Sequence, residues 1–230
     1  ASNLMQFHNA NTAVFTRADA KALAAFASTD QTRQHLNCVL VDFAKGSAVA
    51  TDGHRLAKAN SAACFADAAP CLVPLDAWTR AIKACSKSRC GILVRRAGAA
   101  VRLDTIDPGN HVPLKSFGGE ESPDVSLCSL ATVETRSLDV QFPPYERVIP
   151  DMAAQHADTY TGFGDDKGEH PRAKAIGFNM RYLGDVQLTA EAAGCKGAEL
   201  HPGPGPLDPL VALCNGSEGS WTVVVMPIRI

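Results

Sequence analysis

Residues 47–57 contain the side chains of this chain that are best placed for chemistry. Thr51, Asp52, His54 and Arg55 stand between two short apolar runs, around an Asp-Gly pair. A carboxylate two residues from an imidazole is a combination that general acid–base catalysis uses. The same pattern is typical of a tight turn between two β-strands, in which the polar groups bond to the backbone. The residues alone favour the turn and leave catalysis as the alternative.

The cysteines give no support for a metal site or a catalytic nucleophile. Eight are present, without a C-x-x-C pair and without a neighbouring histidine cluster, which disfavours zinc. A chain of 230 residues with its own core does not need disulfides, so we expect reduced, mostly buried thiols in a cytoplasmic protein. No nucleophile motif, paired-carboxylate spacing or glycine-rich phosphate loop indicates an enzyme. We therefore expect no catalytic residue, no metal and no cofactor.

The composition predicts a folded protein of one or two domains. Hydrophobic residues make up 46% of the chain and charged residues 20%, so a sizeable core can form. The net charge of −2 gives no overall basic field that would indicate nucleic acid, although basic residues can still gather on one face. No apolar run reaches the length of a membrane span, so no membrane partner is expected.

The hydrophobic pattern predicts β-α-β-β-β units that would position the polar residues. In the first unit, residues 13–16 predict a strand. Residues 18–28 predict a helix that Thr16 or Asp19 caps. Three strands then follow, at residues 36–43, 47–51 and 55–60.

The same order of elements occurs twice more, with little sequence identity between the units. The second unit has a helix at residues 77–86, with Asp76 as its N-cap, and strands at residues 71–74, 91–95, 99–103 and 133–141. The third has a helix at residues 180–193, ended by Gly194, and strands at residues 173–178, 197–201, 209–214 and 221–228. The predicted fold class is α+β, with helices on one face of antiparallel sheets.

Two stretches with little periodicity divide this pattern. Residues 106–130 are rich in glycine and proline and predict a loop inserted between two strands. Residues 151–172 are polar and acidic and predict a linker. The expected organisation is a complete domain of two units at residues 1–150, the linker, and a half domain of one unit at residues 173–230.

Four stretches resemble signatures of the bacterial DNA sliding clamp, the β subunit of DNA polymerase III. Residues 51–57, with the sequence TDGHRLA, resemble one wall of that family's protein-binding groove. Residues 142–150, FPPYERVIP, resemble the segment between its second and third domains. Residues 177–183, GFNMRYL, and residues 224–230, VVMPIRI, resemble a helix and the final strand of its third domain. Their agreement in order and separation supports the DNA-clamp fold.

The resemblance covers about one and a half of the family's three domains. Residues 13–150 resemble the complete middle domain, and residues 173–230 resemble the second half of the last domain. The family's first domain, on which the usual two-chain ring depends, has no counterpart. The family ring comprises twelve units, and four chains of three units would supply the same number, because a repeated head-to-tail contact can close a ring. A monomer is the other expectation.

The resemblance also implies a hydrophobic groove for short peptide motifs of DNA polymerase or other clamp-binding proteins. Such a groove would have an apolar floor and a polar rim. Glu146 stands where relatives often carry a basic residue. The groove residues implied by the resemblance are Arg33, Leu36, Thr51, Gly53, His54, Arg55, Leu56, Pro143, Arg147, Val148, Asn179, Tyr182, Val224, Val225, Met226, Pro227, Ile228 and Arg229.

In the family, basic residues on helices face DNA without reading its sequence. The spacing of Arg80, Lys83 and Lys87 would place them on one helix face, where they would make salt-sensitive phosphate contacts. An ordinary solvated helix face is the alternative. The candidates for DNA contact are Arg17, Lys21, Arg80, Lys83, Lys87, Arg181 and Lys196.

Two functions follow from the resemblance. The first is a sliding-clamp-like processivity factor of DNA replication or repair, which tethers polymerase-type partners and encircles DNA as an oligomeric ring. The second is a peptide-binding module that forms no ring and recruits or sequesters clamp-binding proteins. Both would act in the cytoplasm and neither is an enzyme.

Overall fold

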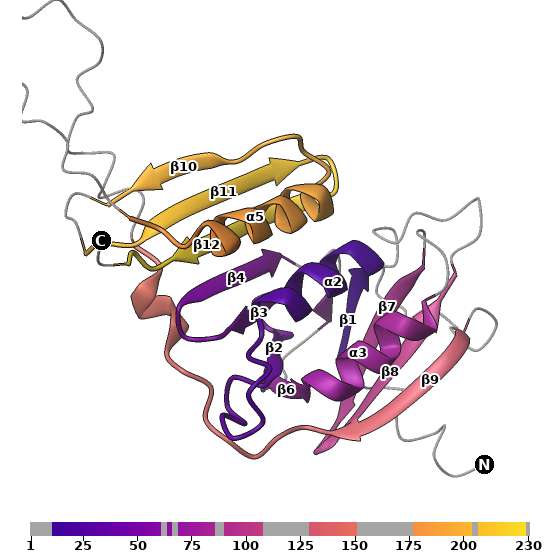
Figure 1. Cartoon of the computed structure of the whole chain (residues 1–230). Helices are drawn as coiled ribbons and strands as arrows, with labels where there is room; N and C mark the ends of the chain where they lie inside the picture. Colours follow the sequence, from indigo (N-terminus) through magenta and orange to yellow (C-terminus); the bar gives the residue numbers. More distant parts are fainter. Residues whose placement is uncertain are drawn as a thin grey trace, which may run out of the picture.

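Two antiparallel β-sheets and the helices packed on them make up the fold (Figure 1). The computed structural model describes residues 11–60, 64–65, 69–85, 90–107, 129–150, 177–203 and 207–228. The predicted insertion at 106–130 lies largely outside these residues, and so does the whole predicted linker at 151–172. The proposed division into domains therefore stays a prediction.

The first unit has the predicted order of elements. Thr16 caps its helix, since the hydroxyl accepts a hydrogen bond from the Asp19 backbone N–H and the Asp19 carboxylate accepts one from the Thr16 N–H. A short strand, β5 (Cys64–Phe65), follows the unit and was not predicted. The elements of the first unit are β1 (Asn11–Thr16), α2 (Arg17–Phe26), β2 (Cys38–Asp42), β3 (Ser47–Thr51) and β4 (Arg55–Asn60).

The second unit repeats this order, with two corrections to the prediction. Asp76 is not the N-cap of the helix, because Pro74 occupies that position and Asp76 lies in the first turn. The strand predicted at residues 133–141 already ends at Arg136. Beyond it, the Leu138 N–H donates a hydrogen bond to the Leu72 carbonyl of the other sheet. The elements are β6 (Cys71–Pro74), α3 (Leu75–Ala84), β7 (Gly91–Ala97), β8 (Ala100–Ile106) and β9 (Ser129–Arg136).

The third unit is described from Gly177 onward, so most of its predicted first strand lies outside the described residues. Its helix has the predicted bounds and ends at Gly194, which adopts a left-handed conformation (φ 72°) that glycine accepts without strain. The elements are α5 (Met180–Ala193), β10 (Glu199–Pro202), β11 (Leu210–Gly216) and β12 (Gly219–Val225).

The units exchange strands. The first strand of each of the first two units pairs with the other unit, so that β1 lies beside β7 and β6 lies beside β2. The last strand of the third unit, β12, pairs with β4 and makes one seven-stranded sheet of the order β10-β11-β12-β4-β3-β2-β6. The other sheet has the order β5-β1-β7-β8-β9.

The helices pack on one face of these sheets, and the main core lies beneath them (Figure 1). Helix α2 contacts both α3 and α5. Phe15, Phe26, Trp78 and Trp221 belong to this core, and the Trp78 indole donates a hydrogen bond to the Ala20 carbonyl. The predicted α+β class, with helices on one face of antiparallel sheets, is confirmed among the described residues.

Candidate functional site

The connection between β3 and β4 is a turn whose polar groups are occupied by the backbone. The Asp52 carboxylate accepts hydrogen bonds from the backbone N–H groups of His54 and Arg55, at 2.9 and 3.1 Å. The Thr51 hydroxyl donates to the Arg55 carbonyl and accepts from the Gly53 N–H. These polar groups therefore stabilise a structural turn, because the Asp52 carboxylate is bonded to two backbone N–H groups and to the Arg55 guanidinium.

Gly53 lets the turn approach its neighbour closely. Its φ is +91°, and a Cβ built at this position would lie 2.8 Å from Nη2 of Arg33. The Arg33 guanidinium meanwhile donates a hydrogen bond to the Asp52 carbonyl. The turn and Arg33 therefore form one continuous wall.

Arg55 joins the first and third units. Its side chain is 7% exposed, and its guanidinium lies between the rings of Phe26 and Tyr182, 4.8 and 4.7 Å from their centroids. It forms ion pairs with Asp52 and with Asp185 of α5. Its remaining N–H group donates to a carbonyl at the end of α2. Such extensive pairing compensates a buried charge for its lost hydration.

The pairing of β12 with β4 places Val224 opposite Leu56 and Val225 opposite Arg55. Because successive residues of a strand face opposite sides, only one of the two valines can face the groove. Val224 packs with Leu56 and Tyr145 on the face away from the helices, whereas Val225 is fully buried in the core beneath them. The prediction that Val225 lines the groove is therefore wrong.

Residues 137–150, which we call the strap, cross the face of the seven-stranded sheet away from the helices. The Ser137 hydroxyl accepts a hydrogen bond from the Leu72 N–H, which fixes the beginning of the strap. Apolar side chains, among them Phe142, pack on the sheet. The 3-10 helix η3 (Tyr145–Val148) follows, and the Tyr145 ring is buried against the sheet.

An apolar cavity of about 420 Å³ lies where the turn, the strap and β12 meet. Eleven of the predicted groove residues line it, and His35, Pro144 and Tyr145 join them without having been predicted. The predicted residues in the lining are Arg33, Leu36, Thr51, Gly53, Arg55, Leu56, Pro143, Arg147, Val148, Val224 and Met226.

The other predicted groove residues that the structure describes do not line this cavity. The exposed His54 ring stacks on Tyr182 at a centroid separation of 6.2 Å, on the side where Arg55 meets α5. The Asn179 side chain caps α5 by accepting a hydrogen bond from the Arg181 N–H. Pro227 and Ile228 continue the chain beyond Met226, and Arg229 lies outside the described residues.

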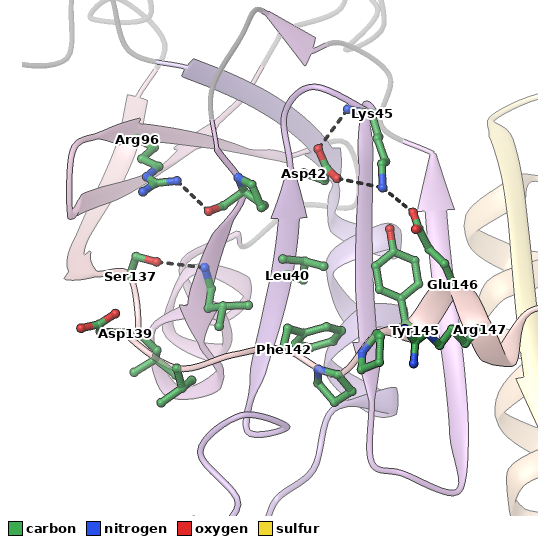
Figure 2. A pocket seen from close by; sticks show the side chains of 16 residues that line it. Leu40, Asp42, Lys45, Arg96, Ser137, Asp139, Phe142, Tyr145, Glu146 and Arg147 are labelled. Carbon is green, nitrogen blue, oxygen red and sulfur yellow. Dashed lines mark hydrogen bonds and ion pairs between the residues drawn. The ribbon is translucent and has the colours of Figure 1, made fainter.

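A second cavity, of about 680 Å³, adjoins the first beneath the strap (Figure 2). Both cavities share Pro143, Pro144, Tyr145 and Arg147 as a common wall. The sequence did not predict this second cavity, because the pattern of residues 137–141 indicated a continuing strand and not a segment that crosses a sheet.

An ion pair fastens the strap at this cavity. Lys45, in the turn after β2, pairs with Glu146 of η3 and lies 3.8 Å from Asp42 (Figure 2). The hydrogen bond with Lys45 lowers the pKa of Glu146, and the same bond raises the pKa of Lys45. Both side chains are largely exposed, so the pair contributes little stability and chiefly orients η3.

The buried thiols of Cys38, Cys71 and Cys85 are structural. Burial raises the pKa values of Cys38 and Cys71 to about 12 and that of Cys85 to about 11. These thiols stay protonated at neutral pH and are poor nucleophiles. Among the described residues, no three His, Cys, Asp or Glu side chains are grouped to hold a metal ion.

The basic residues predicted to face DNA differ in exposure. Lys21, Arg80, Lys83, Arg181 and Lys196 are exposed, whereas Arg17 is half-buried at the start of α2. Arg80 pairs with Asp76 at 3.3 Å, which reduces its free charge. Lys87 lies outside the described residues. No helix in the described part of the chain is both long enough and apolar enough to cross a membrane.

Comparison with known proteins gives a consistent result at the level of structure. No protein-family model and no curated protein matches the chain. The β subunits of DNA polymerase III from Thermotoga maritima and Borrelia burgdorferi match 95% of it, at 19% and 12% identity and TM-scores of 0.58 and 0.62. The DNA polymerase sliding clamp from Bacillus subtilis matches 95%, at 14% identity and a TM-score of 0.58. The chain thus has the fold of the bacterial DNA sliding clamps, and spans about 65% of the length of these proteins.

Proposed function

We propose that this chain is a non-catalytic, clamp-like processivity factor of bacterial DNA replication or repair. It tethers polymerase-type proteins through short peptide segments that enter the 420 Å³ cavity. It holds DNA without sequence preference within an oligomeric ring, and it acts in the cytoplasm.

The observation that carries this proposal is the cavity itself. Segments far apart in the sequence form it: the turn, the strap and β12. Its lining is mostly apolar, and its polar side chains are those of Arg33, His35, Thr51, Arg55 and Arg147. This composition suits bulky apolar side chains followed by a peptide carboxylate. Met226 and Val148 are 37% and 45% exposed, and they offer apolar surface that a ligand would cover. Met226 also supplies an adaptable side chain.

Fluorescence anisotropy with a labelled short peptide that ends in Leu-Phe tests the groove. Val148→Asp and Met226→Asp each put a charge into the cavity wall without disturbing the core. We expect each variant to raise the dissociation constant at least about tenfold, which is a loss of about 1.4 kcal/mol in binding free energy. Leu207→Asp is the control, because Leu207 is 62% exposed and does not line the cavity. Unchanged affinity in both variants would refute the groove.

His54 belongs to the rim by resemblance, and its ring stacks on Tyr182. His54→Ala should weaken binding of the same peptide if the peptide extends from the cavity over this pair. An unchanged dissociation constant would limit the binding site to the cavity.

The helix face is the proposed DNA surface, on the exposed charges of Lys21, Arg80 and Lys83. Reversal of all three to Glu should weaken association with duplex DNA at low salt. The slope of log K against log salt should become shallower by about 0.9 for each phosphate that the variant no longer neutralises. Lys58→Glu is the control, since Lys58 follows Leu56 by two residues on β4 and so faces away from the helices. An unchanged slope would contradict the assignment.

A second function that the same cavity supports is a peptide-binding module without a ring, which recruits or sequesters clamp-binding proteins. A protein that binds the peptide as a monomer and is not retained on closed circular DNA would have this function.

A further inference from the structure

Two cysteines meet where the C-terminal end of α5 packs on β11 (Figure 1). Cys214 lies on β11 opposite Trp221, and its side chain is fully buried in the core beneath the helices. Cys195 follows Gly194, and its backbone N–H donates a hydrogen bond of 3.0 Å to the Ala190 carbonyl. This bond folds Cys195 back onto the last turn of α5, so both thiols lie at the same end of the helix.

The two thiols contact neighbouring residues of α5 and interact with each other. The Cys195 Sγ lies 3.5 Å from the Ala190 carbonyl oxygen and 3.1 Å from that of Gly197. The Cys214 Sγ lies 3.4 Å from Oγ1 of Thr189. Burial raises the pKa of Cys214. The hydrogen bond with Thr189 opposes this effect, and a hydrogen bond with the Cys195 thiol adds to it. The two sulfur atoms are therefore close enough to interact directly.

The backbone around the pair is closely packed. A Cβ built at Gly216, two residues after Cys214, would lie 2.1 Å from the Ala193 carbonyl oxygen and 2.9 Å from the Cys195 nitrogen. The Glu218 N–H donates a hydrogen bond of 2.8 Å to the same Ala193 carbonyl. These contacts hold the end of β11 against the end of α5, so the two thiols stay neighbours in the folded chain.

The two thiols differ in their access to solvent. Cys195 is partly exposed at the surface, whereas Cys214 is fully buried. A small reagent can therefore reach the first thiol, and the second lies behind it as a resolving thiol. Cys85 and Cys90 are another pair of interacting thiols, but both are fully buried. Access thus distinguishes Cys195 and Cys214 from a pair that has the same chemistry.

We propose that Cys195 and Cys214 form a reversible thiol–disulfide site. The Cys195 thiolate attacks one sulfur of a small disulfide such as oxidised glutathione, which gives a mixed disulfide and releases one glutathione thiol. The Cys214 thiolate then attacks the Cys195 sulfur and releases the second glutathione. An Sγ–Sγ bond forms, the two protein thiols are oxidised, and the small disulfide is reduced to two thiols that take up the two protons. This site is separate from the groove and does not depend on the proposed function.

The disulfide would tie the end of α5 to β11 and close a loop of the chain that contains β10. A crosslink of this kind restricts the unfolded chain, so the oxidised protein should be more stable than the reduced protein. The state of the thiols would thereby set the stability of the third unit.

Mass spectrometry of the full chain tests the site. The native protein is incubated with oxidised glutathione, its remaining thiols are alkylated with iodoacetamide, and it is digested with trypsin. Trypsin cleaves after lysine and arginine, so Cys195 lies in the peptide of residues 182–196 and Cys214 in that of residues 197–229. We expect these two peptides to be joined, and dithiothreitol to separate them. Cys85 and Cys90 are the internal control and should be recovered alkylated.

Two variants give the order of the steps. In Cys214→Ala, the reaction should stop at a stable mixed disulfide between glutathione and Cys195. In Cys195→Ser, Cys214 should stay reduced because no reagent reaches it. Circular dichroism of both variants checks that they are folded.

Urea denaturation compares the oxidised and the reduced protein, and the oxidised form should have the higher midpoint. The proposal fails if the unmodified protein keeps glutathione on Cys195 without joining the two peptides, or if Cys195 does not react. It also fails if Cys85 and Cys90 become linked as readily, because access would then not select the site. A midpoint that stays equal or falls on oxidation would contradict a crosslink that fits the native junction.

Discussion

At the scale of single residues, Arg55 determines how the first and third units meet. Its guanidinium is bonded to the turn, to α2 and to α5, and two aromatic rings enclose it. Side chains without charge would not hold these three elements in the same way, because neither carboxylate partner would then have a counter-ion.

Replacing Arg55 by Met keeps the apolar stem and removes the charge. The variant leaves Asp185 and Asp52 without their partner, and we expect a loss of about 3 kcal/mol in the free energy of unfolding. Urea denaturation followed by circular dichroism measures it. Arg80→Met is the control, since the exposed pair of Arg80 with Asp76 should contribute less than about 1 kcal/mol. Equal losses in the two variants would contradict this role of Arg55.

The buried thiols give a second prediction. Burial holds the pKa values of Cys38 and Cys71 near 12, so their thiolate forms are scarce at pH 8. Alkylation by iodoacetamide, read by mass spectrometry, should be at least about a hundredfold slower in the native protein than in urea. Cys195, which is half-buried at the surface, is the internal control. Equally fast labelling of Cys38 and Cys195 in the native protein would contradict burial.

At the scale of elements, the turn between β3 and β4 forms the rigid wall of the cavity. Its backbone N–H groups are bonded within the turn, and Gly53 supplies a conformation that other residues rarely adopt. The wall therefore exists before any ligand binds, which reduces the entropy that binding must overcome.

Gly53→Ala should test this wall. The added methyl group would meet Arg33 and would also hold φ at an unfavourable +91°, so we expect about 2 kcal/mol of destabilisation. Gly98→Ala provides the comparison, because Gly98 has φ +60° but open space around it, and it should lose only about 1 kcal/mol. Urea midpoints of the two variants give the difference. If Gly98→Ala cost as much as Gly53→Ala, neither the contact with Arg33 nor the larger φ of Gly53 would matter.

At the scale of the whole molecule, the continuous sheet makes the third unit part of the same body as the first. The pairing of β12 with β4 joins them within the sheet, and the packing of α2 on α5 joins them on its helical face. The cavity lies across this junction, so a loose junction would leave it without a fixed shape.

The two tryptophans report on the two sides of the junction. Trp78 lies in α3 and Trp221 in β12, and both are buried. In Trp78→Phe and in Trp221→Phe, the remaining fluorescence should follow urea unfolding with the same midpoint as circular dichroism, because the body unfolds as one. A separate, earlier transition of Trp221 fluorescence would show that the third unit unfolds independently.

Local patterns in the sequence were sufficient for most elements. The helix from Met180 to Ala193 has its predicted bounds because Gly194 ends it through its own backbone preference. The strands around Asp52-Gly53 and the cap at Thr16 likewise depend on neighbouring residues alone. Patterns of this kind gave a wrong prediction at Asp76, because Pro74 occupies the N-cap position of α3. They also failed at residues 137–141, because this segment leaves its own sheet and crosses the other one.

The sequence by itself determined the order of units, the turn and, through resemblance, most residues that line the cavity. Only the tertiary structure decided which of them face it. Val224 and Val225 are chemically alike, and the register of β12 against β4 sends one to the cavity and the other to the core. Register and strap position depend on contacts between residues distant in the chain, and for that reason the second cavity and the role of Tyr145 could not be predicted from local sequence.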